Sequence, residues 1–127
     1  MHITIAGSGI VYAPKGTYKI NSTLTSNNEG LTILGDGSLD TVFLGNQTAD
    51  TPIFHFGFKW QSFRNLQIAG ICSGVLLASG TGLNQKDATL ENVRFQNRGT
   101  YGVLIKKGDG VAHCDNNVIR RCQFSGP

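Results

Sequence analysis

Acidic, basic and titratable side chains gather in one stretch near the end of the chain. Residues 106–115 read KKGDGVAHCD, and two arginines follow at 120 and 121. Two carboxylates and an imidazole are groups that can transfer protons, and the four cations could hold an anionic sugar. A solvated loop between two structural repeats would have the same composition, so the catalytic residues stay unknown. The candidates for catalysis are Asp109, His113, Asp115 and Arg120, and those for binding carbohydrate are Lys106, Lys107 and Arg121.

A second candidate for carbohydrate binding is the cluster Phe58-Lys59-Trp60. The indole ring of Trp60 can lie flat against the apolar face of a sugar, and Lys59 beside it can hold a carboxylate. The alternative is that Trp60 covers the edge of a structural repeat before Phe63 turns inward. We name Trp60 and Lys59 as binding candidates and keep packing as the other interpretation.

The clusters that carry known polysaccharide chemistry are missing. An inverting hydrolase needs two or three carboxylates close together, and a lyase needs carboxylates for calcium with an Arg or Lys base beside them. The sequence has no Asn-Thr-Asp, Asp-Asp or Gly-His-Gly motif, and Asp36 lies between two glycines, as in a turn. Three cysteines without a CxxC pair predict neither a disulfide framework nor a metal site. We therefore expect no cofactor, and calcium only if the protein is a lyase.

The elements that must position these residues repeat along the chain. The segment 63–70 is answered 27 residues later by 90–97, and 119–126 makes a third copy. A repeat of 27 to 29 residues made of short strands is typical of a coil that stacks on copies of itself, which predicts a parallel β-helix. The expected apolar columns are Phe63/Leu90/Ile119, Leu66/Val93/Cys122 and Ile68/Phe95/Phe124.

Each repeat must bend between its first and second apolar positions. Asn65 and Asn92 occupy the bend, where asparagine tolerates a left-handed backbone, so stacking should produce a ladder of amides. Arg121 replaces asparagine in the third copy, and the ladder should end there. The preceding positions should alternate in charge up the stack: Arg64, Glu91 and Arg120.

Length and charge set further bounds. The 127 residues form one domain of about four to five coils, with opening strands over residues 1–30 and stacked coils over 31–127. Residues 1–58 carry a net charge of −2 and residues 59–127 one of +5, so the second part can attract an acidic polysaccharide, unless its cations are only a solvated face. We expect no nucleic acid, because no recognised binding motif accompanies the charge. We also expect no membrane span and, from Met1-His2-Ile3, no secretory signal.

A resemblance to a known family begins at residue 9. The run GIVYAPKGTYKI over 9–20, then Leu24, then LTILGDGS over 31–38 resembles the opening of the pectate-lyase-superfamily β-helix domain. That domain occurs in polysaccharide lyases, rhamnogalacturonan-type hydrolases and the tailspikes of many bacteriophages. The resemblance spans nearly the whole chain and implies an all-β, right-handed, single-stranded parallel β-helix. It bears on the fold more than on the activity, because the matching residues are scaffold.

The sequence departs from that family at both ends. Such domains usually begin with a strand and a helix that cover the first coil, and they continue for several coils beyond the position of 125–127 here. An open last coil is an association hazard, so we expect it to be covered by further coils of a longer protein or by a partner subunit. The resemblance to tailspikes implies a homotrimer.

Three functions are compatible with these observations. The first is a tailspike-like or tail-fibre-like module with a structural and host-polysaccharide-recognition role, located in the virion, on a phage tail or capsid surface, or otherwise extracellular. The second is a polysaccharide lyase or glycoside hydrolase of the pectate-lyase type, whose active site is incomplete here or lies between subunits. The third is a ligand-free structural cement or cap of a virion. Whether the protein is an enzyme stays open.

Overall fold

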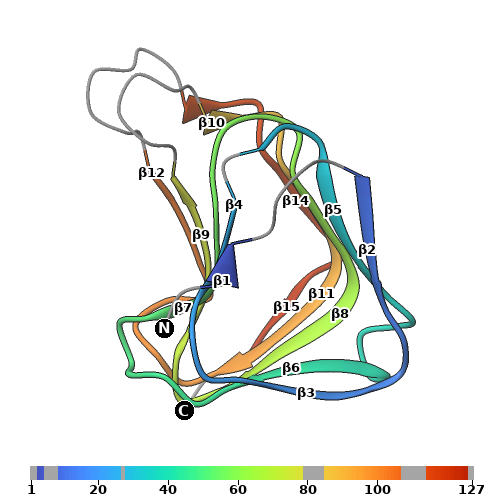
Figure 1. Cartoon of the computed structure of the whole chain (residues 1–127), viewed down its shortest axis with the longest axis vertical. Coiled ribbons are helices and arrows are strands. Elements are labelled where there is room, and N and C mark those ends of the chain that lie inside the picture. The colour runs from blue at the N-terminus through green and yellow to red at the C-terminus, as the bar shows by residue number, and fades with distance from the viewer. Residues whose placement is uncertain (1–2, 5–8, 27, 79–84, 107–113, 126–127) are drawn as a thin grey trace.

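The chain folds into a stack of short parallel strands (Figure 1). The computed structural model describes residues 3–4, 9–26, 28–78, 85–106 and 114–125. Within these ranges there are strands and turns but no helix, hence none long and apolar enough to cross a membrane, and all strand pairs are parallel. The protein is therefore an all-β parallel β-solenoid, and the prediction of a parallel β-helix is confirmed.

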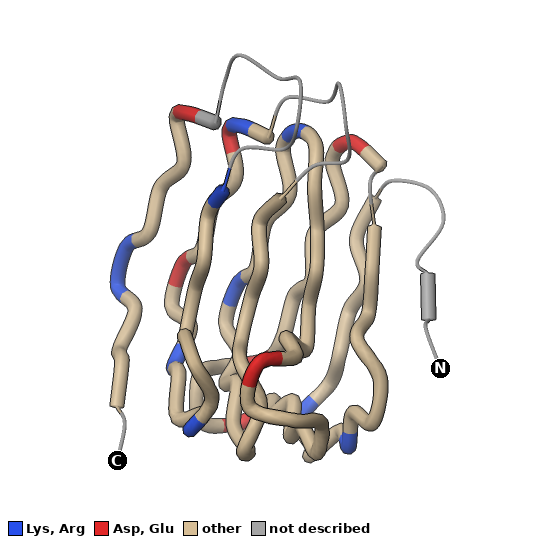
Figure 2. Tube along the Cα trace, turned by 90° about the vertical axis from the view of Figure 1, so that its left-hand side faces the viewer, with Lys and Arg blue, Asp and Glu red and all other residues tan. Residues whose placement is uncertain are grey.

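One wall of the solenoid is a five-stranded sheet. Apart from Lys106 at its last position, its described strands contain no Lys, Arg, Asp or Glu, and Figure 2, which looks onto this side, shows them almost free of charge. The strands, in spatial order, are β1 (Ile3–Thr4), β4 (Leu24–Ser26), β7 (Pro52–Phe56), β9 (Ser73–Ala78) and β12 (Val103–Lys106).

An eight-stranded sheet makes the other walls, and its longest strands span a bend. The main path runs through β14 (Val118–Arg120), β11 (Thr89–Asn97), β8 (Ser62–Gly70), β5 (Leu31–Gly35) and β2 (Gly9–Ala13). Beyond the bend, β3 (Gly16–Ile20) pairs with β6 (Thr41–Gly45), β6 with β8, and β11 with β15 (Gln123–Phe124). A third sheet contains only β10 (Gln85–Lys86) and β13 (Cys114–Asp115).

Alternation of buried and outward residues explains why these segments are strands. In β5 and β6 every second side chain faces the core, which is the period of a pleated strand with one buried face. In each of the two larger sheets, three strands of the main path have a neighbour on both sides: β4, β7 and β9 in one, β5, β8 and β11 in the other. The solenoid therefore has about three turns that are covered above and below. The count of four to five coils, the right-handed winding and the division at residue 30 stay predictions.

The apolar columns stack in the predicted register. Phe63 pairs with Leu90 and Leu90 with Ile119, while Ile68, Phe95 and Phe124 make the equivalent series beyond the bend. Phe63 and Leu90 are fully buried, whereas Ile119 is 42% exposed because β14 is the last strand of its path. Neighbouring Phe rings fill the middle of the core at centroid distances of 5.0 to 5.5 Å: Phe54, Phe56 and Phe63.

The bend has the predicted asparagines. Asn65 and Asn92 have φ angles of 58° and 53°, and the Asn92 Nδ2 donates to Asn65 Oδ1 at 3.0 Å. Arg121 keeps the left-handed backbone, with φ 53°, but has no amide to extend the ladder. The charge alternation is also confirmed, because Glu91 forms ion pairs with Arg64 and, at 2.7 Å, with Arg120.

The turn between β5 and β6 is fastened to β2. The Asp36 carboxylate accepts hydrogen bonds from the Tyr12 hydroxyl and from the Lys15 backbone amide, the latter at 2.7 Å. The Thr41 hydroxyl accepts from the Asp36 amide and donates to the Ala13 carbonyl, both at 2.9 Å. These bonds hold the turn out from the solenoid wall, where it borders the site described next.

Candidate functional site

The described members of the predicted catalytic stretch are spread over three sheets. Lys106 ends β12 and pairs with Ala78 in the five-stranded sheet. Asp115 lies in β13, where it pairs with Lys86. Arg120 lies in β14 of the eight-stranded sheet, against Glu91. Lys107, Asp109 and His113 fall outside the described residues, so the predictions made for them stay untested.

Lys59 and Trp60 lie at the corner just before β8. Lys59 pairs with Lys86 of the next turn, and the Trp60 amide donates to the Lys86 carbonyl at 3.1 Å. The Trp60 side chain is 53% exposed, and the Lys59 Nζ lies 5.0 Å from the centre of the Phe58 ring and 5.9 Å from that of Trp60. An accessible aromatic surface is therefore present, and its use for sugar binding remains a prediction.

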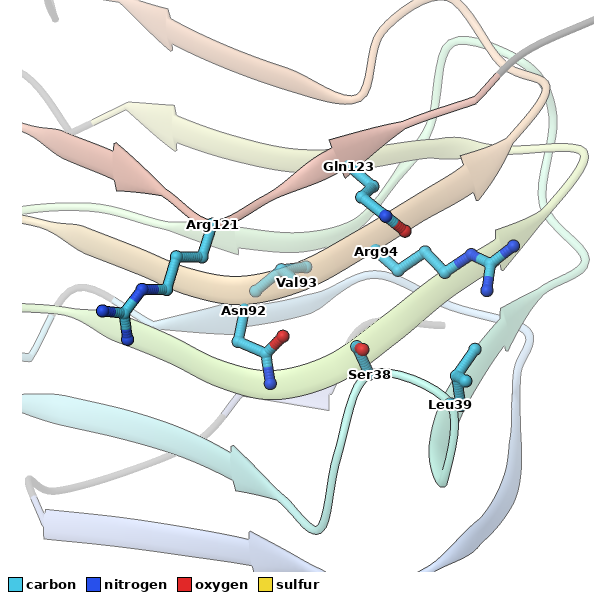
Figure 3. Close-up of a pocket in the computed structure, with 7 residues that line it drawn as sticks. All are labelled: Ser38, Leu39, Asn92, Val93, Arg94, Arg121 and Gln123. Atoms are coloured by element: carbon cyan, nitrogen blue, oxygen red, sulfur yellow. The ribbon is translucent and has the colours of Figure 1, made fainter.

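A pocket of about 280 Å³ lies on the outside of the bend (Figure 3). The turn between β5 and β6 contributes Ser38 and Leu39 to one side. β11 crosses the pocket with residues 92–94, and the last turn supplies Arg121 and Gln123. Segments far apart in the sequence are thus brought together by the fastened turn and by the stacking of coils.

The guanidinium groups of Arg94 and Arg121 extend toward opposite sides of this pocket, with the Asn92 side chain between them (Figure 3). With its amide oxygen turned toward Arg94, Gln96 accepts from the Arg94 Nε at 3.0 Å, which holds the guanidinium laterally. The pocket therefore presents two separated cations rather than one convergent pair. We call this site, lined by Ser38, Leu39, Asn92, Val93, Arg94, Arg121 and Gln123, the arginine pocket.

No carboxylate lines the arginine pocket. Glu91 precedes Asn92 but is held by two arginines, and Asp36 is held by Tyr12 and Lys15. Asp40 belongs to the bordering turn but is not part of the lining. The lining is consequently positive, which favours an anionic ligand.

The lining groups suit binding better than proton transfer. Arginine binds a carboxylate through two parallel hydrogen bonds, and the amide and hydroxyl groups of Asn92, Gln123 and Ser38 can bond sugar hydroxyls. The lining contains no carboxylate or histidine that could act as general acid or base. What this arrangement can do is hold an extended chain with acidic groups at intervals.

Two cysteines have described side chains, Cys72 fully buried and Cys122 half-buried. Burial raises the pKa of the Cys72 and Cys122 thiols, so both stay protonated at neutral pH. Within the described residues, no group of three His, Cys, Asp or Glu side chains could hold a metal ion.

Sequence reasoning named Arg121 but missed its partners in the pocket. Arg94 could have been found, because it points outward two positions after the asparagine of the bend. Ser38 and Leu39 carry no such signal, since their place at the bend depends on the path of the turn. The sequence repeat predicts which residues of successive coils lie over one another. It does not predict the path of the turn between β5 and β6.

Two curated proteins resemble the chain weakly. It is 26% identical over 117 residues to pectinesterase/pectinesterase inhibitor PPE8B of Prunus persica, covering 92% of this chain and 18% of that protein. It is 24% identical over 121 residues to the probable pectinesterase/pectinesterase inhibitor 35 of Arabidopsis thaliana, covering 95% of this chain and 19% of that one. The chain thus spans less than a fifth of the length of these relatives. No protein-family model and no solved structure matches it.

Proposed function

We propose that this chain is a β-solenoid module that binds an acidic polysaccharide of the pectin type along the outside of its bend. The observation that carries the proposal is the arginine pocket, where two guanidinium groups extend to opposite sides and no carboxylate lines the walls. A chain of uronic acids has carboxylates at regular intervals, which fits two separated cations better than a single acid would. The two similar proteins are named as pectinesterases, which supports a pectin-related ligand.

The experiment compares a digalacturonate and a polygalacturonate with an uncharged oligosaccharide by titration calorimetry. The doubly substituted protein R94Q/R121Q should bind both acidic ligands at least about tenfold more weakly, because each loses a charge-assisted hydrogen bond. R98Q is the matched control, since Arg98 is an exposed arginine outside the pocket. Added salt should weaken binding to the unaltered protein more than to R94Q/R121Q. Equal affinities of R94Q/R121Q and R98Q would overturn the proposal.

An enzyme of the same superfamily is the alternative. Its acid and base would then come from Asp109 and His113, which lie outside the described residues, from further residues of a longer protein, or from a second subunit. Lyase, hydrolase and esterase activity on acidic glycans can be separated by the ultraviolet absorbance of unsaturated products, by new reducing ends and by uptake of base at constant pH. A positive result in any of the three assays that D109N/H113Q abolishes would favour this alternative.

The virion location and the homotrimer remain proposals of their own. The two similar proteins come from plants and lend neither of them support. Sedimentation equilibrium gives the number of subunits directly, and a monomer at micromolar concentration would contradict the proposal of a homotrimer.

A further inference from the structure

Trp60 occupies a backbone position that suits other residue types. Lys59, Lys86 and Asp115 lie over one another in successive turns, and the residues that follow them all have a left-handed backbone. Asp and Asn tolerate this conformation, whereas a bulky aromatic residue adopts it only under strain. The three are Trp60 with φ 61°, Asp87 with φ 58° and Asn116 with φ 56°.

The strained residue gives little to the core. Its indole is 53% exposed and has the ammonium of Lys59 5.9 Å from its centre. Strain that persists at an exposed aromatic points to a use of its surface. The corner carries no concentration of one charge that could attract a ligand. Acidic and basic residues follow one another along it from turn to turn, as the upper edge of Figure 2 shows. They are Glu29, Lys59, Lys86, Asp87 and Asp115.

The corner comes just before β8, and the arginine pocket lies at the bend of β11, the neighbouring strand, whose Asn92 bonds Asn65 of β8. Trp60 precedes the bend residue Asn65 by five positions, which is roughly 16 Å along an extended strand. The outward residues between them include Thr32, whose hydroxyl lies 2.8 Å from that of the buried Ser62. They also include the ladder in which one carboxylate, Glu91, is shared by two arginines. The path is thus polar with an excess of positive charge.

We infer that Trp60 is a second subsite for the same acidic polysaccharide that the arginine pocket holds. A sugar ring stacks on the indole while carboxylates further along the same chain are bound by Arg94 and Arg121. The inference rests on the proposed function and adds a requirement for length, because only a ligand that spans roughly 16 Å reaches both points. Lys59 is a positioning residue here, with its ammonium over the aromatic rings.

The test uses the fact that Trp60 is the only tryptophan in the chain. Polygalacturonate should change the tryptophan emission of the unaltered protein, and digalacturonate should bind without changing it. W60N removes the ring and keeps a residue suited to the left-handed backbone, so the variant should fold. It should bind polygalacturonate roughly three- to tenfold more weakly, the scale of one aromatic contact, and digalacturonate unchanged. The matched control is I71N, because Ile71 is likewise exposed (57%) and lies outside both subsites.

The outcomes separate this inference from the proposal beneath it. If polygalacturonate binds with no change in emission, or binds W60N and the unaltered protein alike, Trp60 is no subsite although the arginine pocket stands. If neither acidic ligand binds the unaltered protein, the proposed function fails and the inference fails with it.

Discussion

At Asp36 a single carboxylate joins the turn that borders the arginine pocket to strand β2. The hydrogen bond from the Tyr12 hydroxyl, and then that from the Lys15 amide, lower the pKa of the Asp36 carboxyl. The same bond to Asp36 is the main cause that raises the pKa of Tyr12. Both shifts mean that the ionised carboxylate and the protonated phenol are the stabilised forms.

A pH series should reveal this contact. Because the Asp36 pKa is lower in the folded than in the unfolded state, the carboxylate stabilises the fold above its unfolded pKa, and that contribution is lost as the pH falls through the folded value. D36N should therefore be less stable than the unaltered protein at neutral pH, with a difference that shrinks toward acid. Urea unfolding at several pH values measures it, with E29Q, a change at another exposed carboxylate, as control. A difference that does not vary with pH would contradict the assignment.

Replacing Trp60, unlike replacing Asp36, should increase the stability of the fold, because the backbone at Trp60 is strained. Replacing it by asparagine, the type found at the equivalent Asn116, should raise the free energy of unfolding by about 1 kcal/mol, because the left-handed backbone is no longer strained. W60A serves as control, since it removes the ring without a residue that favours this backbone. Chemical denaturation should rank W60N above both the unaltered protein and W60A. A W60N less stable than the unaltered protein would show that the indole stabilises the fold by packing.

At the scale of the strand, the bends in β8 and β11 depend on asparagine in two separate ways. Its backbone tolerates the positive φ, and its side chain bonds the equivalent amide of the next turn. N92A loses both and should be destabilised by about 2 kcal/mol, while N92G keeps the backbone freedom and should lose only about 1 kcal/mol. Thermal and urea unfolding of the two variants would separate the contribution of the backbone conformation from that of the side-chain hydrogen bond. Equal losses would mean that the amide ladder alone matters.

The strands also show how far the sequence predicts this molecule. The columns headed by Phe63, Leu66 and Ile68, the bend at Asn65 and the shared Glu91 could all be predicted, because stacked coils place equal residues over one another. The arginine pocket could not, since one of its sides is a turn whose path depends on the hydrogen bonds of Asp36 and Thr41. Of its lining, only Arg121 was predicted to bind a ligand, as one of the cations that follow the stretch 106–115.

At the scale of the whole molecule, the solenoid predicts that the contribution of an apolar residue to stability depends on whether its turn lies inside the stack or at its end. Phe63 is fully buried among Phe54 and Phe56, so F63A should lower the free energy of unfolding by about 3 to 5 kcal/mol. Phe124 is 58% exposed and, among the described rings, stacks on Phe95 alone at a centroid distance of 4.8 Å, so F124A should lose about 1 kcal/mol. Denaturant titration of this pair measures the contrast. Similar losses would indicate that a neighbouring subunit buries Phe124.

The pairing of each strand only with the turns before and after it has a dynamic consequence. Among the described strands, β8 has partners on both sides, whereas β14 has β11 alone. Local unfolding should then begin at the outermost described turn and proceed inward one turn at a time. Deuterium uptake should follow the same gradient, reaching the amides of β8 long after those of β14.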